Sequence, residues 1–277
     1  MTDHATILGH LSRQLPTNFG ESNRPGRIVA AATAALDLGL TPSKKLTAAL
    51  TNFDRHNQKA TEHRATLATG TPLDLTADDY PQQVRNHVLA AQVRDDAEHI
   101  TRGLLATAAA DTVQVITEEL PDLLNQLDTL YQQRYPDLLS LGDTRQPTAV
   151  LAAHHDFAGQ LSRAHRAFMA TDPQHNRIEL DYRTDLWLYH RWTPEAWQKA
   201  LNTTGPAMSI NRDVDVWHFA TRCGATPRLA RSHAHAVAEF RALDDANEQR
   251  DILEAHARSA SAAGARSVRE AVKNYIH

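Results

Sequence analysis

Residues 84–135 read VRNHVLAAQVRDDAEHITRGLLATAAADTVQVITEELPDLLNQLDTLYQQRY and contain the longest helical pattern in the chain. In the second half of this stretch, apolar residues are spaced 4, 3, 4 and 3 positions apart, at Ile116, Leu120, Leu123, Leu127 and Leu130. A similar row in the first half consists of Val93, Ala97, Ile100 and Leu104. Because residues three or four positions apart share one face of a helix, the stretch predicts a long central helix over about residues 80–135.

Two features predict that the central helix is not uniform. Its two apolar rows fall out of phase across residues 106–115, so the apolar face must rotate or change its partner there. Pro121 lies inside the pattern and cannot donate a backbone hydrogen bond, so we expect a kink or a break near residues 119–120. We expect the first half to pack inside an N-terminal bundle and the second half to present a partner surface.

Composition indicates the fold class. Only 11 of the 277 residues are glycine and 6% are aromatic, which argues against a sandwich or barrel rich in turns and β-formers. Residues 178–183 alternate apolar and polar side chains and are the one strand candidate, without a visible partner strand. We therefore predict an all-α multi-helix bundle with one long central helix, kinked or broken, and little or no sheet.

A loop divides the helical pattern into two predicted domains. Residues 137–147, DLLSLGDTRQP, follow the central helix and contain turn residues. We place an N-terminal helical domain with the long helix at 1–143 and a C-terminal helical domain at 144–277. Three of the four tryptophans, Trp187, Trp192 and Trp197, are close together in the second domain, and we expect them to anchor its core.

Cysteine usage and hydropathy bear on the compartment. Cys223 is the single cysteine and cannot form an internal disulfide, which is typical of a reducing compartment. The first residues lack a signal-peptide pattern, and the longest mainly apolar run, residues 28–36, is shorter than a membrane span of about 20 residues. We expect a soluble protein with no membrane partner, in the cytoplasm or within a phage particle assembled there.

Charge is unevenly distributed along the chain. The net charge of −4 argues against a protein that coats nucleic acid. Residues 111–143 contain seven acidic residues against one basic residue, Arg134, and such a surface can steer a partner. The alternative is a solvated helix face. The candidate partner surface consists of Glu118, Glu119, Asp122, Asp128 and Tyr131.

The 16 histidines raise the possibility of a metal site. Three acid-x-x-His pairs resemble the ligand spacing of di-metal helical bundles: Asp96 with His99, Asp172 with His175, and Asp215 with His218. With 33 acidic residues in the chain, about two such pairs are expected by chance, and the facing carboxylate row is missing. A metal-binding helical-bundle enzyme is therefore a remote alternative, and we expect no metal and no cofactor.

The chain contains none of the common catalytic motifs that we sought. There is no G-x-S-x-G elbow, no phosphate-binding G-x-x-x-x-G-K and no G-x-G-x-x-G. Cys223 has no histidine that the sequence assigns as its base. We expect a protein that is not an enzyme.

Residues 213–241 resemble a helix-turn-helix. Ala220 and Gly224 would permit close packing and a left-handed turn, and Thr226-Pro227 would open a second helix over residues 227–243. The DNA contacts would be Arg228, Arg231, Ser232 and His235. The same punctuation occurs at Ala35, Gly39 and Thr41-Pro42, where it simply joins two helices. DNA binding is therefore the alternative function.

The leading hypothesis is a non-enzymatic structural or assembly protein that acts through its helical surfaces. It would bind protein partners in a homo- or hetero-oligomeric assembly. Arginine outnumbers lysine 24 to 5, which favours a high-GC bacterial genome or its phage. A virion or assembly component of an actinobacterial phage or prophage is the specific form of this hypothesis.

Overall fold

The structure is a computed structural model. It describes residues 3–15, 23–68, 80–142, 145–172, 184–204 and 215–246, together with 248–250, 252–253 and 255. The protein is all-α with one long helix, as the sequence predicts, and the described residues include one very small sheet. The strand candidate at residues 178–183 lies outside the described residues.

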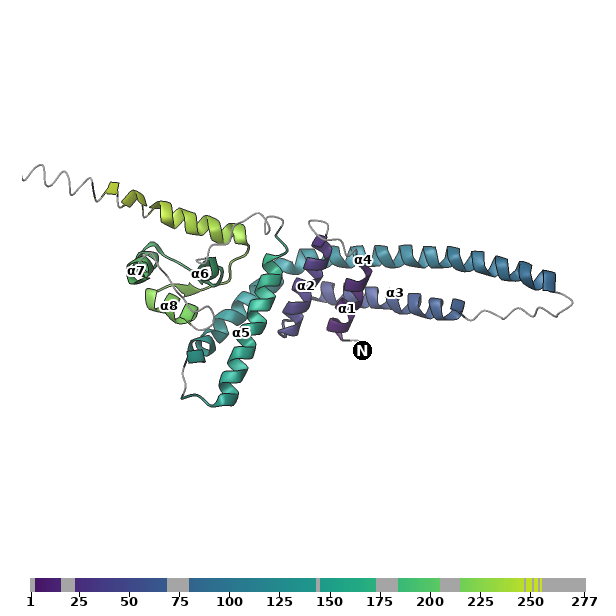
Figure 1. The fold of residues 1–277 in the computed structure, drawn as a ribbon, viewed down its shortest axis with the longest axis horizontal. Coiled ribbons are helices and arrows are strands. Elements are labelled where there is room, and N and C mark those ends of the chain that lie inside the picture. Colours follow the sequence, from purple (N-terminus) through teal and green to yellow (C-terminus); the bar gives the residue numbers. More distant parts are fainter. Residues whose placement is uncertain are drawn as a thin grey trace, which may run out of the picture. The chain divides into compact units, whose positions relative to one another are not determined.

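The helices follow one another along the chain, and two short strands lie among the last of them (Figure 1). The first elements are α1 (His4–Gln14), α2 (Arg24–Asp37), α3 (Lys44–Ala68), α4 (Tyr80–Leu139), a 3₁₀ turn at Ser140–Gly142 and α5 (Thr148–Met169). They are followed by α6 (Thr184–Tyr189), β1 (His190–Arg191), α7 (Pro194–Thr204), α8 (Asp215–Cys223) and β2 (Thr226–Pro227). Residues 233–246 form a further helix.

Local sequence signals account for several helix ends. Gly39 ends the α2 region with a φ of 82°, a conformation that glycine adopts without strain. At the start of α3, the Ser43 hydroxyl oxygen accepts a hydrogen bond from the Leu46 N–H at 3.0 Å, so the cap is Ser43, which directly follows the Thr41-Pro42 pair. Thr193 caps the start of α7, because its hydroxyl oxygen accepts a hydrogen bond from the Ala196 N–H at 3.2 Å.

α4 runs without a break from Tyr80 to Leu139, so of the kink or break expected near residues 119–120, the break is absent. Pro121 lies on an exposed part of the helix surface. The carbonyl four residues earlier, on Thr117, loses its helical partner and can be hydrated on that side. Packing on the opposite side holds the helix together, since Ile116 and Leu123 are 0% and 1% exposed.

The chain forms two compact units, and their limits fall within helices. The first consists of Met1–Leu130 and Asp156–Pro173, and the second of Tyr131–His155 and Gln174–His277. α4 and α5 therefore each contribute to both units. The boundary predicted at 143/144 lies outside the described residues and stays a prediction.

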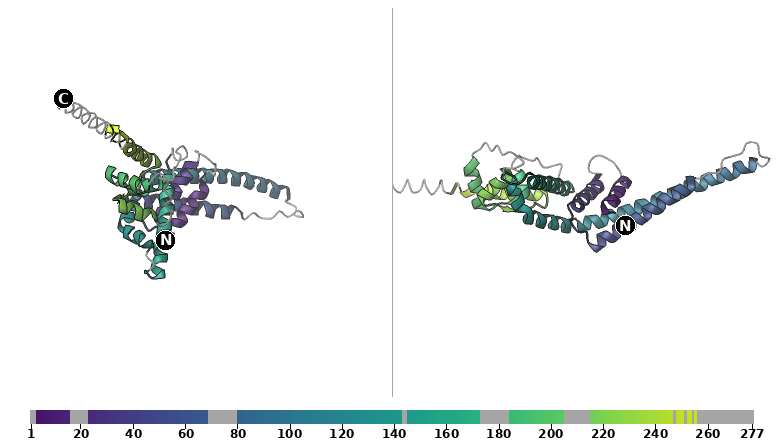
Figure 2. Two further views of the ribbon diagram at one scale, coloured as in Figure 1. Left: turned by 60° about the vertical axis from the view of Figure 1, so that its left-hand side comes forward. Right: turned by 90° about the horizontal axis from the view of Figure 1, so that it is seen from below.

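In the first unit, α3 runs antiparallel along α4 (Figures 1 and 2). Three contacts mark the register: Thr41 exchanges two hydrogen bonds of 3.2 Å with the Gln126 amide, Lys45 pairs with Glu118, and His63 lies 3.3 Å from the Thr101 hydroxyl. The core is formed by apolar residues of α1 to α5, among them Leu8, Leu11, Val29, Leu46, Leu50, Phe53, Ile116, Leu127 and Leu161.

The second unit is built around aromatic side chains. Trp187, Trp192, Trp197 and Trp217 are each at most 5% exposed, and the expectation that the clustered tryptophans anchor a core is confirmed. β1 and β2 pair antiparallel, with His190 opposite Pro227 and Arg191 opposite Thr226. This pairing connects the segment after α6 to the segment after α8.

Candidate functional site

The first half of α4 exposes a row of large apolar side chains. Leu89, Val93, Ile100 and Leu104 are 58%, 64%, 62% and 60% exposed, and we call these four residues the α4 stripe. Of the eight large apolar side chains exposed in the described part of the chain, five lie between Val88 and Leu104. Exposed apolar residues that recur on one helix face mark an interaction site more often than scattered ones do.

The same face of α4 becomes polar beyond Leu104. At 100° per residue, the positions that continue the α4 stripe are exposed and polar: Thr107, Asp111, Glu118, Asp122, Asn125 and Thr129. The apolar residues of this second part lie on the opposite face, where Leu105, Ala109, Ile116, Leu123 and Leu127 are buried. The α4 stripe is thus confined to about four helical turns.

This arrangement explains why the two apolar rows of α4 are out of phase in the sequence. The row at Ile116, Leu123 and Leu127 is buried, as expected, whereas Leu120 and Leu130 are only partly buried. The row at Val93, Ile100 and Leu104 exists but lies on another face and is not covered by this chain's described residues. The expectation that the first half packs inside a bundle is therefore wrong for these side chains.

A groove lies beside the α4 stripe, between α3 and α4. Its volume is about 430 Å³. The wall from α4 includes Ala97, Ile100 and Leu104, and the wall from α3 consists of His56, Lys59, Ala60 and His63. The groove therefore combines apolar side chains on the α4 wall with basic and imidazole groups along the α3 edge.

The acidic residues predicted as a partner surface follow the α4 stripe along the helix. Glu118 is exposed and pairs with Lys45 at 2.5 Å, and it also accepts a hydrogen bond from Gln114. These hydrogen bonds lower the pKa of Glu118, and the Glu118 carboxylate raises the pKa of Lys45. Both groups are in water, so salt screens this pair.

Tyr131 does not lie on this surface. It is 0% exposed, and its hydroxyl donates a hydrogen bond of 2.7 Å to the Tyr189 carbonyl oxygen in the second unit. The prediction that Tyr131 belongs to the partner surface is therefore wrong, because its side chain is buried. Asp122 is exposed, while Glu119 and Asp128 are partly buried.

Tyr131 belongs to a buried polar and aromatic cluster that the sequence did not reveal. The Tyr135 hydroxyl lies 2.9 Å from His190 Nε2, 2.9 Å from the Thr221 hydroxyl and 3.1 Å from the Trp217 carbonyl oxygen. The four-residue spacing of Tyr131 and Tyr135 on α4 is the signal that could have indicated a shared face. The cluster connects α4 to β1 and α8 within the second unit.

The cluster is uncharged at neutral pH. Burial lowers the pKa of His190 to about 3 and raises the pKa of Tyr135. Because both groups are then neutral, the cluster supplies hydrogen bonds and aromatic contacts rather than charge. The centroids of the Tyr131 and Trp217 rings are 5.9 Å apart, and those of Tyr189 and Trp217 are 5.1 Å apart.

The predicted helix-turn-helix is not formed. Thr226-Pro227 is a strand, residues 228–232 are non-helical, and the next helix begins at 233 instead of 227. Backbone hydrogen bonds explain the difference, because the N–H groups of Arg228 and Ala230 donate to the carbonyls of Tyr189 and Leu188. The connection is longer than the three or four residues of the motif.

The four predicted DNA contacts therefore have other roles in the structure. Arg228 is partly buried and forms an ion pair with Glu239. The Ser232 hydroxyl caps the following helix by accepting from the His235 N–H at 3.1 Å, and His235 Nε2 lies 3.8 Å from Glu239. Arg231 is exposed. These four residues do not form one face of a recognition helix.

Other candidate groups offer little chemistry. Cys223 is buried, and burial raises the pKa of its thiol. Among the described residues, no group of three or more His, Cys, Asp or Glu side chains is arranged to hold a metal ion. Of the three acid-x-x-His pairs, Asp96 and His99 are exposed, and His175 lies outside the described residues.

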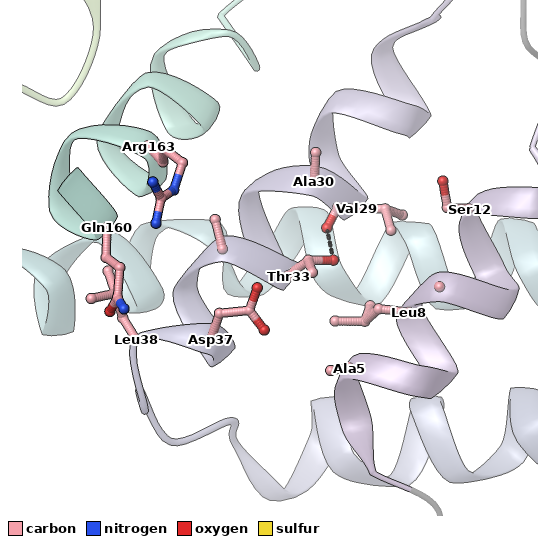
Figure 3. A pocket seen from close by; sticks show the side chains of 12 residues that line it. Ala5, Leu8, Ser12, Val29, Ala30, Thr33, Asp37, Leu38, Gln160 and Arg163 are labelled. Atoms are coloured by element: carbon pink, nitrogen blue, oxygen red, sulfur yellow. Dashed lines mark hydrogen bonds between the residues drawn. The ribbon is translucent and has the colours of Figure 1, made fainter. Parts of the chain in front are cut away.

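A cleft of about 410 Å³ lies between α1, α2 and α5 in the first unit. Leu8 and Val29 contribute apolar wall, and Asp37 and Arg163 reach into the cleft from α2 and α5 (Figure 3). The Thr33 hydroxyl, also at this cleft, donates to the Val29 carbonyl at 2.8 Å and is thereby used within its own helix. The polar groups come from different walls and do not converge on one point.

No protein-family model, curated protein or solved structure matches this chain. In the part of the chain that the structure describes, no helix is both long and apolar enough to cross a membrane.

Proposed function

We propose that this protein is a non-enzymatic structural or assembly component that works through protein–protein contact at the α4 stripe. The observation that carries the proposal is the exposure of Leu89, Val93, Ile100 and Leu104 on one face of a helix that is polar on that face farther along. Apolar side chains in water contribute no burial free energy until a partner covers them.

The composition of the surroundings supports a protein partner. A groove with apolar residues on its α4 wall and Lys59 on its α3 wall adjoins the α4 stripe. The acidic residues Glu118 and Asp122 follow the stripe on the same helix face. Protein interfaces commonly combine an apolar centre with a polar rim that is accessible to solvent. Cytoplasmic location, and the specific role as an actinobacterial phage or prophage component, belong to this proposal and rest on sequence composition.

A photo-crosslinking amino acid at position 100, compared with one at position 129, tests the proposal in cells that produce the full chain. Position 129 is exposed on the same face of α4 but outside the α4 stripe. We expect a discrete protein adduct from position 100, lost in the Leu89→Glu variant, and none from position 129. Equal adducts from both positions, or none from position 100, would exclude the α4 stripe as a protein contact. Capsid, portal or tail genes beside this gene would support the phage role.

A further inference from the structure

The spacing of the α4 stripe reads the same in both directions. Leu89, Val93, Ile100 and Leu104 are separated by 4, 7 and 4 residues. The four-residue spacing of Leu89 and Val93 is also repeated eleven residues later by Ile100 and Leu104. Eleven residues make slightly more than three helical turns, so the row stays on one side of a nearly straight helix.

The α4 stripe also has defined ends. Arg85 and Asn86 precede it on or beside the same face, and Thr107 and Asp111 follow it, all exposed. From Leu89 to Leu104 the row is about 22 Å long, at 1.5 Å per residue. An occupant whose apolar row is of the same length would cover the α4 stripe without burying its polar ends.

The area suits an interface of standard size. At 58–64% exposure, the four side chains present roughly 100 Å² each, or about 400 Å² together. A stable interface takes about 800 Å² from each partner, of which a little more than half is apolar. One α4 stripe therefore supplies about the apolar share that one side of a dimer needs, with the adjoining exposed polar residues as its rim.

We infer that the occupant is α4 of a second copy of this chain, packed antiparallel about a two-fold axis that passes between Asp96 and Ala97. This inference rests on the proposed function and names the partner of the same surface. In this arrangement Leu89 lies opposite Leu104 of the second copy, and Val93 lies opposite Ile100. A two-fold interface pairs a surface with itself, which is what a row with reversible spacing permits.

One residue opposes this pairing. Asp96 is exposed near the centre of the row, and the two-fold axis brings it close to Asp96 of the second copy. Like charges at short distance repel one another, so the Asp96→Asn variant should associate more tightly than the natural chain. A gain of association from one substitution is a specific consequence of an axis at this position.

Sedimentation velocity of the purified full chain over a range of concentrations tests the self-association. We expect a dimer that Ile100→Glu weakens at least tenfold, because a carboxylate would be buried among apolar side chains. Thr129→Glu, on the polar part of the same face, should leave the dissociation constant unchanged. A monomer at all concentrations, or equal effects of the two variants, would overturn the inference.

Cysteine crosslinking tests the direction of the pairing, in a Cys223→Ser background. Leu89→Cys and Leu104→Cys chains are each about 22 Å from their own counterpart in the antiparallel dimer, too far for a disulfide, which needs Cα atoms about 4.4–6.8 Å apart. We expect neither variant to crosslink alone and an equal mixture of the two to crosslink. Crosslinking of each variant alone would show a parallel pair and overturn the inference.

The two proposals can fail separately. A purified chain that stays monomeric, combined with a discrete adduct to another protein from position 100 in cells, would overturn the second copy as the occupant. The proposed contact surface would then remain. Absence of both the dimer and any adduct would remove the inference and the proposed function together.

Discussion

The two halves of α4 carry apolar rows of similar periodicity and have opposite surroundings. Leu127 in the second half is 0% exposed, whereas Leu104 in the first half is 60% exposed. Hydrogen bonds at Thr41, Lys45 and His63 place α3 along one side of α4, and the α4 stripe lies on a different face. Periodicity therefore indicates which side chains share a face, and it does not indicate whether this chain covers that face.

The largest expected effect lies in the covered half. Leu127→Ala should lower the free energy of unfolding by about 2–5 kcal/mol, because it leaves a cavity at a position without solvent access. Urea denaturation of the full chain, followed by circular dichroism, measures this loss. A loss below about 0.5 kcal/mol would mean that the second half of α4 is not packed as described.

A smaller effect concerns how the end of α4 is held in the second unit. Burial lowers the pKa of His190 from 6.5 to about 3, so between these values the unfolded chain binds a proton that the folded chain does not. Above pH 6.5, His190 is therefore neutral in both the folded and the unfolded chain and costs no stability. Below pH 6.5, the free energy of unfolding decreases as the pH falls, by up to about 1.4 kcal/mol per pH unit.

Urea denaturation at pH 7, 6, 5 and 4 measures this dependence. The His190→Asn variant is the control, since asparagine does not titrate. The free energy of unfolding of this variant should therefore decrease less over the same pH range. Other titrating groups are common to both proteins, so the difference between them isolates His190. Parallel curves for the two proteins would mean that His190 is not held neutral.

The smallest expected effect lies in the uncovered half. Leu104→Ala should change the free energy of unfolding by no more than about 0.5 kcal/mol when the protein is dilute enough to be monomeric, because this side chain is mostly in water already. The same urea titration measures it beside Leu127→Ala. A loss above about 2 kcal/mol in the dilute monomer would show that this chain covers the α4 stripe, and the contrast between the two halves would disappear.

Predictions from local patterns were right where the cause is local. The helix end at Gly39 depends on a few neighbouring atoms, and the structure contains it where the sequence indicates. The prediction of a second helix in the apparent helix-turn-helix was wrong because a distant segment determines the conformation there. Thr226-Pro227 can start a helix, but pairing with His190 and Arg191, distant in sequence, holds it extended.

The exposure of the residues in the candidate surface was predicted correctly only in part. The acidic residues Glu118 and Asp122 are exposed as expected, while Tyr131 on the same helix is buried against the second unit's aromatic core. Tyrosine is suited to both environments, since its ring is apolar and its hydroxyl polar. Only the position of the Tyr189 carbonyl decides that Tyr131 is a core residue.

The sequence by itself determined the helical class, the long central helix, the aromatic core and the two apolar rows of α4, because helix periodicity and tryptophan burial follow from side-chain chemistry within one segment. Tertiary structure decided that α4 passes Pro121 without a break, that Tyr135 meets His190, and that the row from Leu89 to Leu104 stays exposed. The reason is that burial depends on which other segments pack against a face, and the described segments leave the four side chains of the α4 stripe 58–64% exposed.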